Sequence, residues 1–165
     1  MPLRLAKLTL TASVALLLAL VAFNNISDYQ SNFAFVAHVL SMDTTFRHDS
    51  VMWRALEAPA LHHAAYLVII GCELTAAAGC FVATLRFARA LNAHGAVFGA
   101  AERPAVLSLT LSMILWLTGF LVVGGEWFHM WQSADWNGQA SAFRMFAISA
   151  IALLVVIQPE ASSHR

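Results

Sequence analysis

The residues best suited to chemistry follow a long apolar run, in the stretch 124–131 that reads Gly-Gly-Glu-Trp-Phe-His-Met-Trp. Glu126 and His129 are three residues apart, which is the spacing of the Glu-x-x-His motif in di-iron carboxylate bundles. Those bundles use the motif twice and add two further glutamates. Because this chain has the motif once, the pattern argues against a di-iron centre.

Projected as an α-helix, the same stretch has two distinct faces. One face holds Glu126, His129, Met130 and Ser133, and the other holds Trp127, Phe128 and Trp131. Such an arrangement is typical of a transmembrane helix that leaves the bilayer with one side against protein.

Polar side chains also stand at the ends of three other apolar segments. Antiparallel threading of the four segments brings these ends to one side of the membrane, where they form a single polar layer in the outer leaflet. The predicted layer contains Asn24, Asn25, Asp28, His62, His63, Glu126, His129 and Arg144. It is either a ligand site or a structural one, in which Glu126 and Arg144 form an ion pair that fixes the third and fourth helices.

One carboxylate, Glu73, falls near the middle of the second apolar segment, on the same helical stripe as His62, Tyr66 and Cys80. An ionised carboxylate at that depth is costly, so we expect Glu73 to face the bundle and to be protonated or hydrogen-bonded. The candidate partners at matching depth are Ser112, Trp116 and Ser149. The acid has either a structural role or a role in proton relay or ligand binding.

Two kinds of cofactor fit these residue types. Haem b would need His62 or His63 to face His129 from a neighbouring helix. A quinone or lipid would use His62, His63, Glu126 and His129 around an apolar slot. The tryptophans Trp53, Trp127, Trp131 and Trp136 are better explained as a membrane-interface belt than as a cofactor cage.

The elements that must position these residues are transmembrane helices. The chain is 60% hydrophobic and 11% charged, against about 25% charged in a soluble domain, so lipid must solvate much of its surface. The predicted fold is all-α, a single domain over 1–165 with a four-transmembrane-helix bundle. The predicted spans are about 5–26, 60–88, 104–131 and 142–157, and the second is longer than the roughly 20 residues that a bilayer requires, so it must tilt or protrude.

The first apolar segment could be a secretory signal peptide, but its core is longer than usual and lacks a clean cleavage pattern, which favours a retained helix. Between the first two spans, the exterior segment 28–59 is predicted to be partly helical and to lie on the membrane. A small-residue stripe, Gly71, Thr75, Gly79 and Ala83, predicts close approach of another helix.

Lys and Arg residues predict the orientation. Six lie on the side of both termini, namely Arg4, Lys7, Arg86, Arg89, Arg103 and Arg165, and three lie on the other side, namely Arg47, Arg54 and Arg144. The positive-inside rule therefore puts both termini in the cytoplasm. The zero net charge gives no indication of nucleic-acid binding, and the soluble-enzyme motifs for phosphate loops and nucleophile elbows are absent from the sequence.

Two blocks of sequence carry a resemblance. The first runs Phe-Asn-Asn-Ile-Ser-Asp-Tyr from 23 to 29 and continues through Ser-Asn-Phe-Ala-Phe-Val and His-Val-Leu-Ser-Met-Asp-Thr-Thr-Phe to residue 46. The second comprises Gly-Gly-Glu-Trp-Phe from 124, Met-Trp-Gln-Ser from 130 and Trp-Asn-Gly-Gln from 136. Together they resemble a bacterial family of predicted small integral membrane proteins whose domain has no known function. The resemblance implies four transmembrane helices in the bacterial cytoplasmic (inner) membrane, and it carries over no catalytic or cofactor residue.

Small size and the lack of a complete catalytic constellation favour a non-enzymatic accessory or assembly subunit of a larger membrane complex. Its partners would be the lipid bilayer and another membrane protein or a second copy of the chain. The alternatives are a redox protein that binds haem b or quinone and, less favoured, an oligomeric proton-coupled transporter that uses Glu73.

Overall fold

The computed structural model describes residues 1–159, and no strand occurs among them. Four helices are long and apolar enough to cross a membrane: Pro2–Ser27, Pro59–Ala90, Gly95–Trp127 and Gln139–Val156. The predicted all-α membrane fold is therefore confirmed. Arg165 lies outside the described residues.

The first, second and fourth spans are α1 (Pro2–Ser27), α4 (Pro59–Ala90) and α7 (Gln139–Val156). Proline occupies the first turn of α1 and of α4, where its missing N–H has no helical partner to lose. The third span is continuous in space but has three parts: α5 (Gly95–Ala100), α6 (Glu102–Ile114) and the π-helix η1 (Leu115–Trp127).

The stretch 124–131 is not one α-helix, and the two faces assigned to it from the sequence are wrong. The wider π-helical turns continue to its end, where the N–H of Phe128 donates to the carbonyl of Val123, five residues back, at 3.0 Å. The helix ends at Trp127, and His129 has a left-handed backbone (φ 53°) that starts the short 3₁₀ helix η2 (Met130–Gln132). An α-helical projection therefore fails for the residues from Leu115 onwards.

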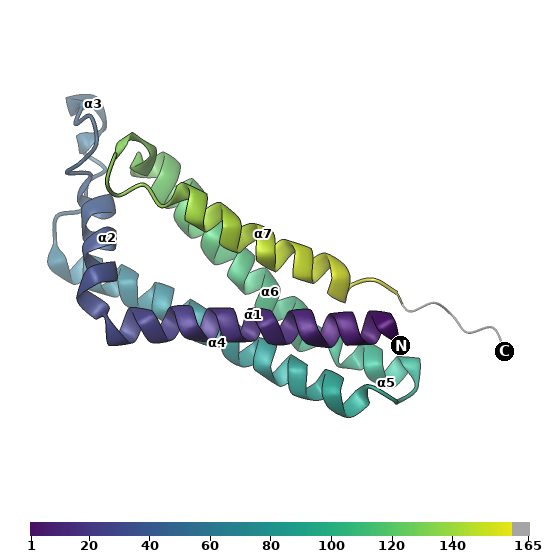
Figure 1. The fold of residues 1–165 in the computed structure, drawn as a ribbon. Helices are drawn as coiled ribbons and strands as arrows, with labels where there is room; N and C mark the ends of the chain where they lie inside the picture. Colours follow the sequence, from purple (N-terminus) through teal and green to yellow (C-terminus); the bar gives the residue numbers. More distant parts are fainter. Residues whose placement is uncertain (160–165) are drawn as a thin grey trace.

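The exterior segment contains two helices, α2 (Tyr29–Ser41) and the single turn α3 (Asp49–Met52). Figure 1 shows α2 turning away from the end of α1 and crossing towards η1 and α7. We call this end of the bundle the α2 end, and the end that holds Met1, α5 and Pro159 the amino-terminal end.

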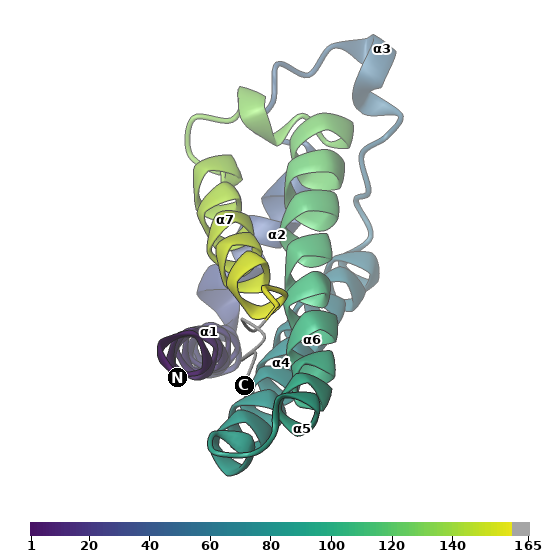
Figure 2. The same cartoon turned by 90° about the vertical axis from the view of Figure 1, so that its right-hand side faces the viewer.

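The four spans converge at the amino-terminal end and separate towards the α2 end. Figure 1 shows α1 and α4 side by side in one pair, and α7 with α6 and η1 in the other; Figure 2, in which α1 is seen nearly end-on, shows the same two pairs. The largest buried apolar cluster includes Leu18, Cys80, Phe87, Phe98 and Leu109 and joins the pairs where they converge.

Part of the small-residue stripe does bring helices together. A Cβ atom on Gly79 would lie 1.9 Å from Ser108 Oγ of α6, and Ala83 is fully buried. A Cβ on Gly71 would meet nothing within 4 Å. Within the small-residue stripe, close contact with another helix is therefore found at Gly79 and Ala83 but not at Gly71.

Candidate functional site

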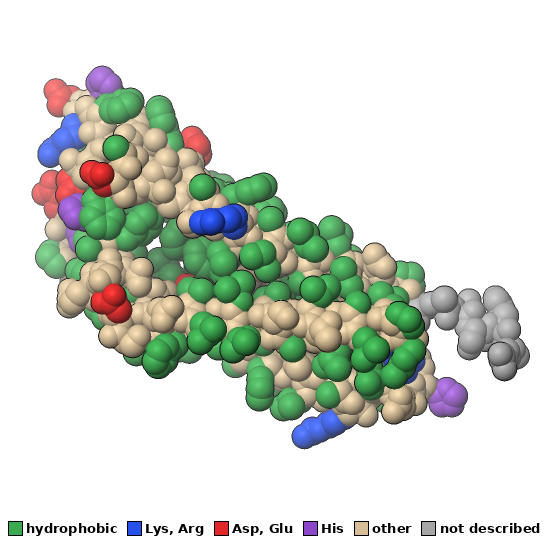
Figure 3. Space-filling model, in the orientation of Figure 1, with side chains coloured by type: hydrophobic (Ala, Val, Ile, Leu, Met, Phe, Trp, Pro, Cys, Tyr) green, Lys and Arg blue, Asp and Glu red, His purple; other side chains and the backbone are tan. Residues whose placement is uncertain are grey.

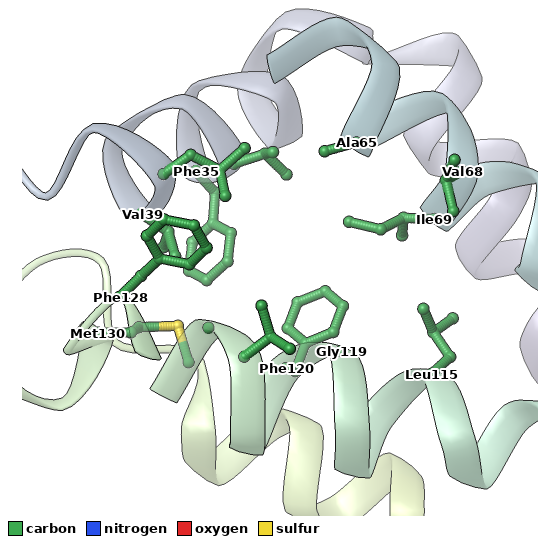
Figure 4. A pocket seen from close by; sticks show the side chains of 14 residues that line it. Phe35, Val39, Ala65, Val68, Ile69, Leu115, Gly119, Phe120, Phe128 and Met130 are labelled. Carbon is green, nitrogen blue, oxygen red and sulfur yellow. The ribbon is translucent and has the colours of Figure 1, made fainter. Parts of the chain in front are cut away.

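An apolar cavity of about 330 Å³ fills the space where the helix pairs separate. Figure 4 shows side chains from α2, α4 and η1 around it. Its lining is formed by Phe35, Val36, Val39, Leu40, Ala65, Val68, Ile69, Leu115, Gly119, Phe120, Val123, Gly124, Phe128 and Met130. Every side chain in this lining is apolar, so the cavity suits a hydrocarbon chain and offers nothing to an ion.

The cavity is enclosed by α2, which crosses between α4 and η1, and it stays unfilled because two glycines of η1 have no side chain. Phe35 of α2 stacks on Phe120 of η1, with ring centroids 6.2 Å apart, and its ring lies against Gly138 so closely that a Cβ there would be 2.7 Å away. On the η1 wall, Gly119 and Gly124 contribute no side chain, and a Cβ on Gly119 would meet only Leu115 at 3.7 Å. Larger residues at these two positions would reduce the volume.

One edge of the cavity reaches the surface of the helix bundle. Val68 on α4 is 64% exposed and Val123 on η1 is 41% exposed, and both line the cavity. Figure 3 shows hydrophobic side chains over the length of the bundle, with charged ones mainly at its two ends. Val68 and Val123 therefore belong both to the cavity lining and to the apolar outer surface of the bundle.

Glu73 is fully buried and bonded to Asn25. Asn25 Nδ2 donates to Glu73 Oε2 at 2.7 Å, and the Tyr66 hydroxyl donates to the main-chain oxygen of Asn25 at 2.9 Å. The serines expected as partners of Glu73 bond each other instead, Ser112 Oγ to Ser149 Oγ at 2.9 Å. The partner is Asn25 because α4 continues past the end of α1, so the last turn of α1 lies level with Glu73 rather than with the start of α4.

Two buried polar atoms next to the cavity have no hydrogen-bond partner within residues 1–159: Glu73 Oε1 and Trp116 Nε1. Glu73 is one helical turn beyond Ile69, and the Trp116 ring packs 4.7 Å from the ring of Phe120. Ile69 and Phe120 both line the cavity, so Glu73 and Trp116 are neighbours of its lining residues without lining it themselves. A buried polar group left unpaired costs about 1–3 kcal/mol, which a ligand with a carbonyl or hydroxyl group would recover here.

The three histidines of the predicted polar layer have three different environments. His62 Nε2 donates to the main-chain oxygen of Leu56 at 2.6 Å, while His63 bonds the Tyr29 hydroxyl at 2.8 Å and stacks on the ring of Phe33. His129 Nε2 accepts from Arg54 at 3.3 Å. None of the three lines the cavity.

These contacts leave no preformed metal or haem site in the part of the chain that is described. No group of three or more His, Cys, Asp or Glu side chains there could hold a metal ion. The histidines that haem b would need bond other groups: His62 bonds the main-chain oxygen of Leu56, His63 the hydroxyl of Tyr29 on α2, and His129 the side chain of Arg54. The sequence-based quinone site, with Glu126 and the histidines around the slot, is also not assembled.

The remaining members of the predicted layer are separate. Arg144 Nη2 donates to Ser141 Oγ at 2.9 Å, and the described residues hold no ion pair between Arg144 and the exposed Glu126. Asp28 accepts from Ser31 Oγ at 2.9 Å, and Asn24 is exposed. Within residues 1–159, Asn25 and Glu73 are the one pair of these polar site residues that share a hydrogen bond between side chains.

The tryptophans hold the α2 end together. The Arg54 guanidinium lies over the rings of Trp127 (4.9 Å) and Trp53 (5.5 Å), which meet edge to face. Trp136 stacks on His38 at 4.5 Å, and Trp131 meets Phe46 edge to face at 6.0 Å. These contacts join the α2–α3 segment to the turn that follows η1.

Sequence reasoning missed the cavity. Its signals in the sequence are the two glycines of the η1 wall, Gly119 and Gly124, and the phenylalanine at Phe35. Those residues become a site only through the separation of the helix pairs, which the sequence pattern does not encode.

The comparison with protein families gives one match, to the model described as "Predicted small integral membrane protein (DUF2165)", over residues 3–159. No curated protein and no solved structure matches the chain.

Proposed function

We propose that this chain, which belongs to the family of predicted small integral membrane proteins, is a non-enzymatic membrane protein that binds an amphipathic lipid. The observation that carries the proposal is the all-apolar cavity of about 330 Å³ with an exposed apolar edge at Val68 and Val123. Its volume falls within the range of small-molecule pockets, roughly 300–1,000 Å³.

The ligand would place its chain in the cavity and a polar group beside Trp116 and Glu73. Trp116 Nε1 donates, and Glu73 Oε1 donates or accepts according to its protonation. A quinone carbonyl accepts from Trp116 Nε1, and it accepts from Glu73 only where that carboxyl group is protonated, so a quinone ring with its isoprenoid tail suits these groups. The quinone site proposed here is therefore built from Trp116 and Glu73 instead of the histidines.

Binding of a short-chain alkylated benzoquinone to the purified protein, followed by quenching of tryptophan fluorescence, tests this function. We expect Gly119→Leu, which fills the cavity, to weaken binding at least about tenfold, since a buried leucine-sized contact is worth roughly 1.5–3 kcal/mol. Gly71→Leu is the matched control, because a side chain there meets open space. Equal affinity in the two variants would contradict the proposal.

Removing one hydrogen bond should have a smaller effect. Trp116→Phe keeps the ring contact with Phe120 and deletes only the Nε1 donor, so the affinity should fall about fivefold, in line with about 1 kcal/mol for one hydrogen bond. An unchanged affinity in this variant, together with a large loss in Gly119→Leu, would keep the chain-binding cavity and reject the polar-group assignment.

A second candidate function is that of an accessory or assembly subunit of a larger membrane complex, or of a homo-oligomer. The observation that favours it is the exposed aromatic surface at the α2 end, which includes Phe46, Trp53, Trp127 and Trp131. Aromatic residues are enriched at the centres of protein interfaces. Cross-linking in the native membrane and native mass spectrometry test this function: recovery of the chain alone, without a second copy or another subunit, contradicts it.

For the orientation, we propose that both termini face the bacterial cytoplasm, in the inner membrane. The support is the excess of cations at the amino-terminal end, where Arg4, Lys7, Arg86, Arg89 and Arg103 are found, against Arg47, Arg54 and Arg144 at the α2 end. Labelling of single cysteines with an impermeant reagent in intact cells should modify a cysteine at Arg47 and spare one at Arg103, and the reverse pattern contradicts this orientation.

The proton-coupled transporter would use Glu73, the acid buried in the middle of α4. Its test is a proton-flux measurement in vesicles that contain the protein, where Glu73→Gln should abolish the flux. Flux that persists in this variant excludes Glu73 as the proton carrier.

A further inference from the structure

A second hollow, of about 310 Å³, lies at the amino-terminal end, between the last turns of α4 and the short helix α5. Two of its lining side chains are cationic, Arg86 and Arg89, and the other five are alanine or valine. It is separate from the cavity at the α2 end, with which it shares no lining residue.

This hollow is held open by specific contacts. Phe87 of α4 and Phe98 of α5 are fully buried and stack with ring centroids 5.1 Å apart. Arg4 of α1 donates to the main-chain oxygens of Leu91 (2.9 Å) and Ala93 (2.6 Å), and its guanidinium lies 4.7 Å from the Phe98 ring. These contacts fix the connection between α4 and α5. They thereby hold α5 opposite Arg86 and Arg89 of α4 across the hollow.

The two rim arginines carry uncompensated charge. Both are exposed, and among residues 1–159 neither makes a hydrogen bond or an ion pair, while the nearby acid Glu102 is bound by Lys7 at 2.6 Å. Arg86 and Arg89 stand three residues apart at the end of α4, so their side chains project from neighbouring positions on one face. Guanidinium groups placed in this way suit a phosphate, which arginine binds in a bidentate manner.

We propose that this hollow is a binding site for an anionic phospholipid of the leaflet at the amino-terminal end. The lipid phosphate lies between Arg86 and Arg89, and the glycerol and the first acyl carbons lie on the alanine and valine side chains. The apolar part of the lining is what selects a lipid over free phosphate. Basic residues near a membrane surface contribute about fivefold each to the binding of anionic lipid.

The test uses the full chain in detergent, titrated with short-chain phosphatidylglycerol and detected by native mass spectrometry. We expect the double variant Arg86→Gln, Arg89→Gln to lose about 25-fold in affinity, from the product of two fivefold effects. The matched control is Arg47→Gln with Arg144→Gln, which removes the same charge from the α2 end. Equal losses of affinity in the two double variants overturn the proposal, because the effect would then depend only on the net charge of the protein.

The contribution of shape needs its own pair of variants. Ala100 lines the hollow and Ala96 does not, although both are exposed on α5. Ala100→Trp should abolish retention of phosphatidylglycerol while both arginines remain, and Ala96→Trp should not. Equal binding of phosphatidylcholine to the wild-type protein, or displacement of the lipid by millimolar inorganic phosphate, overturns the assignment to an anionic lipid. A failure here leaves the cavity at the α2 end untouched, since none of these variants reaches it.

Discussion

At the amino-terminal end of the bundle, Lys7 is fully buried and its ammonium group binds Glu102 Oε1 and the main-chain oxygen of Gln158, each at 2.6 Å. At the α2 end, α4 and η1 are separated by a cavity and connected through α2 by aromatic and aliphatic side chains. Lys7 thus connects α1 to α6 and to the segment after α7 at one end, whereas the other end is hollow. The difference separates a packed end with a buried polar contact from a hollow end of the same helices.

The largest loss of stability is expected from Lys7→Met, which leaves Glu102 without its cation at the point where the helices meet. Breaking a buried ion pair costs about 3 kcal/mol or more, and because the Glu102 side chain is 25% exposed we expect a smaller loss, about 2 kcal/mol. The free energy of unfolding in mixed detergent micelles measures it, with the exposed Arg47→Met as the control. A loss below about 1 kcal/mol would show that the contacts of Lys7 with Glu102 and Gln158 do not stabilise this end of the bundle.

A loss of similar size is expected from Gly79→Leu, because a side chain there overlaps Ser108 of α6. Overpacking of this kind costs about 2 kcal/mol. Gly71→Leu, on the same helix but facing open space, should change the unfolding free energy by less than about 0.5 kcal/mol. If both variants lose the same amount, the contrast in packing between Gly79 and Gly71 is wrong.

Asn25→Leu tests the contact between α1 and α4 that lies between the amino-terminal end and the cavity at the α2 end. The variant removes the only hydrogen-bond donor that the described residues give to the Glu73 carboxyl group, and we expect a loss of about 1–2 kcal/mol. The neighbouring Asn24 is exposed, so Asn24→Leu serves as the control in the same unfolding assay. Identical effects of the two substitutions would contradict the Asn25–Glu73 contact.

The smallest effect is expected at the α2 end itself, from Trp127→Leu. This variant removes one of the two rings beneath the Arg54 guanidinium, a contact worth about 0.5–1 kcal/mol at an exposed site. The global stability should barely change, while trypsin cleavage after Arg54 should become faster, because α3 is less firmly held to the turn after η1. An unaltered cleavage rate would mean that other contacts hold α3.

The sequence was sufficient to predict the four spans, because each contains enough consecutive apolar residues to cross a bilayer. It also identified Glu73 as the acid that the bundle must accommodate. Its partner could not be predicted, because depth along straight helices that begin at one level does not account for α4, which starts beyond the end of α1 and so brings Asn25 level with Glu73.

Two further features could not be predicted for physical reasons. The π-helical geometry of η1 changes which residues share a face from Leu115 onwards, and an α-helical projection cannot anticipate it. The cavity depends on the angle between helix pairs, which is set by contacts such as that between Gly79 and Ser108 rather than by hydrophobic periodicity.

The central claim is that the gap between α2, α4 and η1 holds a lipid chain. Native mass spectrometry of the protein extracted from its own membrane tests it most directly, with wild type, Gly119→Leu and Gly71→Leu compared under one set of conditions. A small molecule should be bound in wild type and in Gly71→Leu and should be lost in Gly119→Leu. Retention of the same molecule by Gly119→Leu, or its absence from wild type, would contradict the account.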